Sequence, residues 1–229
     1  MRTSAIIVAA GSGLRLGLGT PKAFVAINGI LLLSYVLRTI RATDALDEVV
    51  LAVPAGTQEF ARSEVNAAGV QIPVKIIEGG TKRQDSVRLA LGFTSAESEL
   101  IVIHDAARPF ATPQMFSACI TAAAESGGAI LAIPVADTLK RVEDGIVVST
   151  IPREGLWQAQ TPQVFRRELL IRGHEAAITG RIIVTDDAHV CERLGAKLQV
   201  VPGSASNLKI TTPDDLRLGE MIARFGFPH

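Results

Sequence analysis

Short apolar stretches alternate with longer amphipathic stretches along the first half of the chain. A short, almost continuously apolar run is typical of a strand whose two faces are both buried in a sheet. Between such runs, apolar residues from Leu33 to Ile40 keep the i, i+3, i+4, i+7 spacing of one helix face. This alternation predicts an α/β fold with a mostly parallel sheet and helical connections. The expected strands are Ser4–Ala10, Glu48–Val53, Val74–Ile77, Leu100–His104 and Ala129–Pro134, and further helices are expected at Arg83–Thr94 and Pro113–Glu125.

The pattern changes after Pro134, where polar and apolar residues alternate at every second position. Three short strands are predicted there, at Asp137–Arg141, Gly145–Ile151 and Leu156–Ala159, with a turn at Glu143-Asp144-Gly145. They form a protruding β-arm over about residues 136–160. Such a hairpin is marginal alone in water, so we expect it to pack against a second subunit in a homodimer. Beyond the arm we expect helices near Arg166–Thr179 and Asp186–Leu194, a strand Leu198–Val201, and a last helix with Thr212 as N-cap, Pro213 at its first position and Asp215 three residues after the cap.

Length and charge narrow the classes of protein that the chain fits. Its 229 residues suit one α/β domain with a substantial core, so we expect a single domain over residues 1–229. Lys plus Arg number 23, as do Asp plus Glu, and this balance argues against nucleic acid or a membrane as a partner. Cys119 and Cys191 lack ligand-like neighbours, which indicates buried thiols in a reducing compartment. With no cleavable leader and no apolar run of membrane length, we expect a cytoplasmic protein.

Residues 5–22 form the most informative stretch, because an apolar strand leads directly into a glycine loop that carries Arg15 and Lys22. Glycine lets backbone amides approach a polyphosphate, and the two cations suit the charge of a phosphoryl-type reaction. The G-x-G-x-x-x-G spacing is one residue longer than the dinucleotide fingerprint, and Lys22 follows Pro21 rather than the glycine of a Walker loop. A flexible surface turn is the alternative interpretation.

A carboxylate follows another strand at the same edge of the predicted sheet, where open α/β sheets bind ligands. Asp105 comes directly after Leu100–His104 and is placed like a Mg²⁺ ligand, because magnesium is commonly held by one or two carboxylates plus substrate phosphate oxygens. The alternative is that Asp105 caps the next turn and pairs with Arg108. We predict no role for His104, since one ring at a strand end is more often packed than catalytic.

Three further segments are weaker candidates. The turn from Gly79 to Ser86 opens a helix and has room for a nucleobase or phosphate, although it also fits an ordinary helix start. Thr185-Asp186-Asp187 fits an N-cap with acids placed favourably against the helix dipole. Lys209 precedes the last helix and, taken alone, reads as solvated surface.

Eight ordered motifs give the chain a resemblance to a known family over essentially its whole length. They are AAGSGLRL, TPKAF, GGTKRQDSV, VIHDAARP, PVADTLKR, REGLWQAQTPQ, VTDDA and NLKITTPDDL. In this order they resemble the 2-C-methyl-D-erythritol 4-phosphate cytidylyltransferases, which have a Rossmann-like, glycosyltransferase-A-type nucleotidyltransferase fold. The resemblance implies transfer of CMP from CTP to the phosphate of methylerythritol phosphate, giving the CDP-alcohol and pyrophosphate in non-mevalonate isoprenoid synthesis. The same branch includes enzymes that act on ribitol 5-phosphate.

The resemblance also implies roles for individual residues. Arg15 and Lys22 match the pair that stabilises the transition state, and Asp105 matches the nucleotide-side magnesium ligand. Thr138 and Arg153 match arm residues that reach into the neighbouring subunit. The remaining positions match the cytidine side (Ala9, Ala10, Gly11, Gly13, Gly80 and Ser86) and the alcohol-phosphate side (Arg108, Thr185 and Lys209).

Three positions depart from the family pattern. Leu14 replaces a second basic residue, Ala23 replaces a glutamine, and Ser206 stands where an acid is common, which leaves Asp105 as the only expected carboxylate ligand of the metal.

The chemistry of the motifs agrees with transfer onto a phosphate. A phosphate monoester has its second pKa near 6 and is largely dianionic at pH 7, so it needs positive charge around it rather than a general base. The motifs supply cations and no nucleophile–base set. Two other classes remain open: a Rossmann oxidoreductase, which would need the shorter glycine spacing and a ribose-binding acid, and a non-catalytic nucleotide-binding regulatory module.

Overall fold

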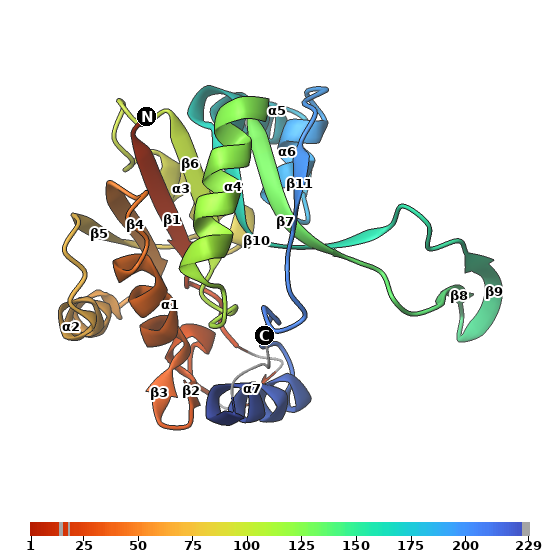
Figure 1. Cartoon of the computed structure of the whole chain (residues 1–229), viewed down its shortest axis with the longest axis horizontal. Helices are drawn as coiled ribbons and strands as arrows, with labels where there is room; N and C mark the ends of the chain where they lie inside the picture. Colours follow the sequence, from red (N-terminus) through yellow and green to blue (C-terminus); the bar gives the residue numbers. More distant parts are fainter. Residues whose placement is uncertain (14–15, 18, 226–229) are drawn as a thin grey trace.

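The computed structural model describes residues 1–13, 16–17 and 19–225. Their centre is a seven-stranded sheet with the order β11-β7-β10-β6-β1-β4-β5 (Figure 1). All neighbouring strands in it run parallel except β10, which is antiparallel to both β6 and β7. The predicted mostly parallel sheet is therefore confirmed. The strands are β1 Thr3–Val8, β4 Glu48–Val53, β5 Val74–Glu78, β6 Leu100–Asp105, β7 Gly128–Pro134, β10 Trp157–Arg166 and β11 Gln199–Pro202.

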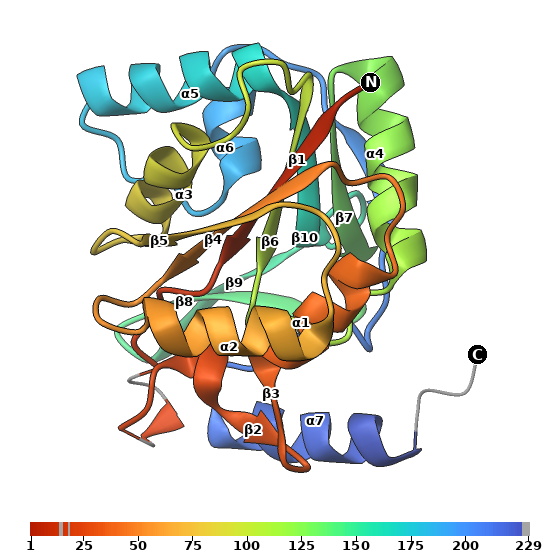
Figure 2. The same cartoon turned by 90° about the vertical axis from the view of Figure 1, so that its left-hand side faces the viewer.

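Helices cover both faces of this sheet (Figure 2). Ala5 and Ile7 of β1 face the layer of α1 (Leu32–Arg41), α2 (Gln58–Ala68) and α4 (Pro113–Ser126). Ile6 faces α3 (Arg83–Leu91), α5 (Arg167–Thr179) and α6 (Asp187–Glu192). The near-continuous apolar runs of the strands follow from this burial on two sides. Cys119 in α4 and Cys191 in α6 are buried free thiols, as expected.

A smaller layer lies below the sheet at the edge where the glycine loop emerges (Figure 1). It contains the turn η2 (Lys22–Phe24), the short hairpin β2–β3 (Ala26–Ile27 and Ile30–Leu31) and the last helix, α7 (Pro213–Phe225). The predicted start of α7 is confirmed, because Thr212 Oγ1 accepts a hydrogen bond from the Asp215 amide while Asp215 accepts one from the Thr212 amide. No helix in the described part of the chain is long and apolar enough to span a membrane.

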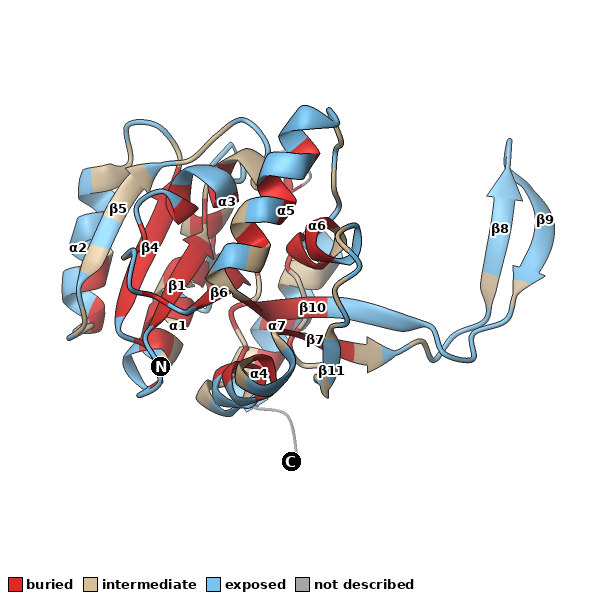
Figure 3. Cartoon of the chain, turned by 90° about the horizontal axis from the view of Figure 1, so that it is seen from above, coloured by how far each residue is buried: buried red, intermediate tan, exposed pale blue. Residues whose placement is uncertain are grey.

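The β-arm is present, but its composition differs from the prediction. β8 (Leu139–Glu143) and β9 (Ile146–Ile151) form a separate two-stranded sheet that projects far from the core and is almost wholly exposed (Figure 3). Their turn is the expected one, with positive φ at both Asp144 and Gly145. The predicted third strand, Leu156–Ala159, is confirmed from Trp157 to Ala159, but it neither ends there nor belongs to the arm sheet.

These residues belong to β10, which continues into the central sheet. Trp157, Gln158 and Ala159 pair with the end of β7, so the long β7–β10 pair forms a stalk that carries the arm. The strand resumes its pairing with β7 at Gln163 after an irregularity. Pro162 lies inside that irregularity and donates no ladder hydrogen bond, which is why the sequence pattern ended the strand too early. Helix α2 was also missed, because its buried residues are mostly small: Ala61, Val65 and Ala68.

Candidate active site

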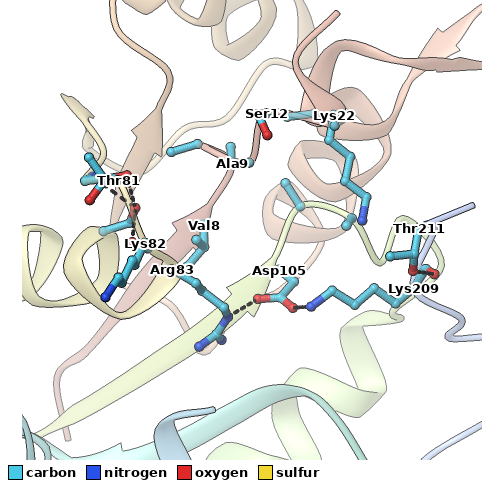
Figure 4. A pocket seen from close by; sticks show the side chains of 18 residues that line it. Val8, Ala9, Ser12, Lys22, Thr81, Lys82, Arg83, Asp105, Lys209 and Thr211 are labelled. Carbon is cyan, nitrogen blue, oxygen red and sulfur yellow. Dashed lines mark hydrogen bonds and ion pairs between the residues drawn. The ribbon is translucent and has the colours of Figure 1, made fainter. Parts of the chain in front are cut away.

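Two adjoining cavities open at the carboxyl-terminal edge of the central strands. The larger has a volume of about 600 Å³ and lies between the glycine loop after β1, the start of α3 and the end of β6 (Figure 4). The smaller, of about 240 Å³, lies between the end of β6, β10 and the segment before α6. Arg83, Asp105 and Lys209 line both cavities and form their common wall.

The structure brings most of the predicted site residues to these two cavities. Arg108 and Thr185, expected on the alcohol-phosphate side, line the smaller cavity. Lys209, also expected on the alcohol-phosphate side, lines both cavities. Residues expected on the nucleotide side or at the reaction centre line the larger one, namely Ala9, Ala10, Gly11, Gly13, Lys22, Gly80, Ser86 and Asp105. Arg15 lies outside the described residues.

Two predicted residues do not reach either cavity of their own chain. Thr138 and Arg153 are exposed in the arm, which points away from the core (Figure 1). The Arg153 guanidinium donates a hydrogen bond to the Ala136 carbonyl at the base of the arm. A role for these two side chains in a site therefore requires the site of another subunit.

The described residues of the glycine loop are held by a backbone hydrogen bond and by close packing, which disfavours the flexible-turn interpretation. The Lys22 amide donates to the Gly11 carbonyl at 3.0 Å and closes the loop. Gly13 has φ +71°, and a Cβ there would lie 2.9 Å from the Thr20 carbonyl oxygen. At Gly79, a Cβ would lie 2.4 Å from the Ala10 Cβ. Glycine is thus required both by the backbone of the first loop and by its close approach to the second.

The second glycine turn is closed by Ser86. The Gly80 amide donates to Ser86 Oγ at 3.1 Å, so the side chain holds the turn against the first residues of α3. Ser86 is nearly fully buried behind the cavity surface. Its hydroxyl therefore shapes the turn that lines the larger cavity.

Asp105 is the electrostatic centre of the common wall (Figure 4). Its Oδ1 accepts from Arg83 Nε at 2.8 Å, and its Oδ2 accepts from Lys209 Nζ at 2.6 Å. Burial alone would raise the pKa of Asp105, but the charges of Arg83 and Lys209 outweigh it and hold the pKa far below its usual range. Asp105 is therefore a carboxylate at any working pH. The alternative pairing of Asp105 with Arg108 is wrong.

Arg108 is held by carbonyl groups instead. Its Nη1 donates to the Asn207 carbonyl at 2.7 Å and its Nη2 to the Ala159 carbonyl at 3.2 Å. No carboxylate forms an ion pair with it in the described part of the chain. Burial lowers its pKa, as expected for a cation without an anionic partner. Its charge is available to an anion in the smaller cavity.

His104, to which the sequence assigned no role, is held in a buried hydrogen-bond network. The Asp105 amide donates to Thr161 Oγ1 at 3.1 Å, and Thr161 Oγ1 lies 3.0 Å from His104 Nδ1. The hydroxyl proton therefore points to Nδ1, and His104 Nε2 donates to the Arg108 carbonyl at 3.1 Å. Burial lowers the pKa of His104 to about 4, so the ring is neutral.

Two glutamines position the segment that carries Thr185. Gln84 Oε1 accepts from the Val184 amide at 3.0 Å, and its Nε2 lies 3.5 Å from the Ile182 carbonyl. Gln163 Nε2 donates to Asp186 Oδ2 at 2.9 Å. Gln84, in the first turn of α3, therefore holds the residues just before Thr185, which lines the smaller cavity. Sequence reasoning missed these contacts because each joins residues far apart in the chain.

The two acids after Thr185 have different functions. Asp186 is the N-cap of α6 and accepts from the His189 amide, as predicted. Asp187 is completely buried and accepts from Arg83 Nη1 at 2.6 Å. The capping interpretation is therefore confirmed for Asp186, and Asp187 lies in the first turn of α6 as predicted, but its side chain also pairs with Arg83.

The sequence model of the 2-C-methyl-D-erythritol 4-phosphate cytidylyltransferase family matches residues 3–224. The chain belongs to this family. A 2-C-methyl-D-erythritol 4-phosphate cytidylyltransferase from Deinococcus radiodurans is 48% identical over 222 residues, which cover 96% of this chain and 89% of that protein. One from Syntrophus aciditrophicus is 42% identical and covers 96% and 95%. The chain is thus a nucleotidyltransferase, and the oxidoreductase alternative is excluded.

Solved structures agree with this assignment. The 2-C-methyl-D-erythritol 4-phosphate cytidylyltransferase of Thermus thermophilus superposes with a TM-score of 0.81 at 34% identity and covers 96% of this chain and 98% of that chain. The 4-diphosphocytidyl-2C-methyl-D-erythritol synthase of Anaerococcus prevotii gives a TM-score of 0.85 at 30% identity, covering 97% and 98%. The predicted Rossmann-like nucleotidyltransferase fold is confirmed by these similarities.

Nucleotidyltransferases generally depend on a divalent cation, and Asp105 is the acidic residue that lines the larger cavity in the described part of the chain. Its oxygens are ionised and line the larger cavity next to the glycine loop. No group of three or more acidic, His or Cys side chains suited to a metal occurs among the described residues, and Ser206 interacts with Ser204. A hard cation shared between one carboxylate and substrate phosphates fits this arrangement, provided that Lys209 leaves Oδ2.

Proposed function

We propose that the chain transfers CMP from CTP to 2-C-methyl-D-erythritol 4-phosphate. A phosphate oxygen of the acceptor forms a bond to the α-phosphorus of CTP, and the bond from that phosphorus to the leaving pyrophosphate breaks. The products are 4-diphosphocytidyl-2-C-methyl-D-erythritol and pyrophosphate, an intermediate and a by-product of non-mevalonate isoprenoid synthesis. Membership of the family carries this proposal.

The two cavities suit the two substrates. We assign CTP to the larger cavity, where the closed glycine turns present backbone amides to a triphosphate. We assign the acceptor phosphate to the smaller cavity, where Arg108, Thr185 and Lys209 converge. The common wall at Asp105 then lies where the acceptor oxygen meets the α-phosphate, so the reaction is favoured by proximity and orientation.

The residues at this wall supply charge rather than acid–base catalysis. The acceptor phosphate is already dianionic near pH 7, so no side chain has to remove its proton. The main barrier is the repulsion between two anionic substrates. Lys22 and Arg15 are proposed to stabilise the charge of the five-coordinate transition state, while Lys209 neutralises the acceptor. His104, neutral and fully hydrogen-bonded, takes no part.

We propose Mg²⁺ as the cation and Asp105 as its protein ligand. When bound, the cation would neutralise phosphate oxygens and act as a Lewis acid. Asp105 offers an ionised oxygen at the edge of the nucleotide cavity. Lys209, whose side chain is 38% exposed, has room to turn from Asp105 towards the acceptor.

We further propose an obligate homodimer in which the arm completes the partner's site. The arm exposes apolar side chains that water does not favour, with exposed fractions of 52% to 70% at Val142, Ile146, Val147 and Val148. Arg153 and Thr138 lie at its base, outside both cavities of their own chain. A two-fold axis that crosses the arms would bring them to the acceptor cavity of the other subunit. The buried free cysteines agree with a reducing, cytoplasmic location.

The proposed reaction is tested by pyrophosphate release from the purified protein with Mg²⁺. CTP with methylerythritol phosphate should give turnover, whereas UTP or ATP should give little. Ribitol 5-phosphate, run in parallel, identifies the acceptor by comparison of kcat/KM. Preference for ribitol 5-phosphate would overturn the proposed acceptor, and nucleotide binding without turnover would make the chain a regulatory module.

The crossed arm is tested with mixed dimers of Lys22→Ala and Arg153→Ala. Each pure variant should be nearly inactive. If Arg153 acts in the partner's site, each mixed dimer has one site with both defects and one intact site. Random mixing in equal amounts then makes about half of the dimers mixed and restores about a quarter of all sites. No recovery, with subunit exchange verified by mass spectrometry, would refute the crossed arm.

A further inference from the structure

In the common wall of the two cavities, Arg83 lies between two buried carboxylates, those of Asp105 and Asp187. Its Nε donates to Asp105 Oδ1 at 2.8 Å and its Nη1 donates to Asp187 Oδ2 at 2.6 Å. Both acids are nearly or completely buried, whereas the Arg83 side chain is 25% exposed. Arg83, which lines both cavities, is thus held by a carboxylate on each of two sides.

Asp187 is not the residue that caps its helix. Asp186 already caps α6 by accepting from the His189 amide. Asp187 points instead into the layer formed by α3, α5 and α6, where His174 Nε2 lies 3.3 Å from its Oδ1. Burying a charged carboxylate completely costs free energy, and Asp187 has no surface with which to contact a ligand. Any contribution of Asp187 to the site must therefore act through the residues that it contacts.

The partner that reaches the site is Arg83. Without Asp187, and once Lys209 has left Asp105 Oδ2, the charges of Arg83 and Asp105 would cancel, and a divalent cation would meet no net attraction at this wall. With Asp187, the four groups Arg83, Lys209, Asp105 and Asp187 are neutral together, and they carry one net negative charge once Lys209 has left. Asp187 also occupies Nη1, so the guanidinium stays on Asp105 Oδ1. Asp105 Oδ2, which accepts from Lys209, is then the oxygen that can release the Lys209 ammonium and bind another cation in its place.

We propose that Asp187 is a positioning residue for the cation site: it anchors Arg83 and balances its charge so that Asp105 Oδ2 attracts a divalent cation together with the nucleotide. This inference rests on the proposed function, since it takes Asp105 as the metal ligand. Removing a residue that orients a metal ligand typically weakens metal binding by about 10-fold to 100-fold.

The test measures Mn²⁺ binding by electron paramagnetic resonance, with CTP and without the acceptor, so that no turnover occurs. Mn²⁺ takes the same oxygen ligands as Mg²⁺. Asp187→Asn keeps the size of the side chain and removes its charge, and it should raise the Mn²⁺ dissociation constant by about tenfold. Thermal denaturation of each variant, run beside the titrations, records the loss of stability separately.

Glu48→Gln is the matched control for loss of a buried, ion-paired carboxylate. Glu48 is 3% exposed, pairs with Lys75 at 3.3 Å and begins β4, so it lies at the opposite edge of the sheet from the site. This variant should lose stability while its Mn²⁺ affinity in the presence of CTP stays that of the wild type.

A second pair of variants isolates the route through Arg83. The double variant Arg83→Gln/Asp187→Asn should differ from Arg83→Gln in Mn²⁺ affinity by less than Asp187→Asn differs from the wild type, because Asp187 then has no guanidinium to anchor or balance. If Asp187→Asn alone fails to fold, the double variant Arg83→Gln/Asp187→Asn can still be compared with Arg83→Gln, since replacing both members of a buried ion pair costs less stability than removing one of them. Equal affinities of wild type and Asp187→Asn, or an Asp187→Asn effect in the Arg83→Gln background as large as in the wild type, would overturn the inference. Wild-type protein that binds CTP without any dependence on Mn²⁺ would overturn the proposed metal site itself.

Discussion

Acidification should destabilise this protein through His104. The ring is completely buried, donates to the Arg108 carbonyl and accepts from Thr161, so a second proton would have to enter a site arranged for the neutral form. Burial lowers its pKa from 6.5 to about 4. The unfolded chain therefore binds this proton at a higher pH than the folded chain, and stability is lost as the pH falls from about 6.5 towards 4.

The magnitude follows from the two pKa values. Between pH 7.5 and pH 4.5, His104 alone should reduce the free energy of unfolding by about 2.5 kcal/mol. Native domains are typically stable by about 5–15 kcal/mol, so this loss is easily measured. Acids such as Asp105 and Asp187, whose pKa values are lowered in the fold, add their own losses chiefly below about pH 4.

Urea denaturation at several pH values, at one protein concentration, measures the effect. His104→Gln removes the titrating ring, and its stability should be lower near neutral pH because the ring also packs on Phe116 with centroids 5.0 Å apart. The difference between wild type and variant should shrink by about 2.5 kcal/mol from pH 7.5 to 4.5. Parallel curves over this range would refute the assignment of a depressed pKa to His104.

Three further outcomes concern the reaction. Lys22→Ala should lower kcat by on the order of 10²-fold with little change in the KM for CTP, whereas the exposed Lys197→Ala should behave as wild type; weak CTP binding at normal kcat would make Lys22 a ground-state anchor. Asp105→Asn should shift the Mg²⁺ titration of pyrophosphate release by at least about tenfold, and an unchanged titration would exclude it as a ligand. Gln84→Ala should raise the KM for the acceptor about fivefold without raising that for CTP, as expected for one lost hydrogen bond; the exposed Gln71→Ala is its control, and equal effects on both substrates would contradict a local role.

Elements with their own local signals were predictable from the sequence. β4 matches its prediction residue by residue, because Glu48–Val53 is apolar on both faces and ends at Pro54. Helix α4 begins at Pro113 after the Thr112 cap and ends before Gly127, which has positive φ. In both cases the residues that fix the boundary adjoin the element itself. Such local signals can be recognised in the sequence without knowledge of the tertiary structure.

The rest depends on contacts between distant parts of the chain. β10 is recognisable as a central strand only once β6 and β7 lie on either side of it, because Pro162 interrupts its pattern. In the site, the strand-end position of Asp105 was predictable, but its contact with Arg83 was not. The hydrogen bond from Arg83 to Asp187 joins residues 104 positions apart, and the sequence around neither residue indicates the contact with the other.

The common wall of the two cavities has a consequence for inhibitor design. A single molecule that joins a cytidine-like group to a polyol phosphate through a short anionic linker could occupy both cavities and place its linker against Lys209 and Arg108. Such a bisubstrate ligand loses its translational freedom only once, so its affinity can exceed that of either half by orders of magnitude. Because Arg83 and Lys209 border both cavities, substitutions there that weaken such a ligand would also impair binding of the natural substrates. The enzyme would then have few routes to resistance that leave catalysis intact.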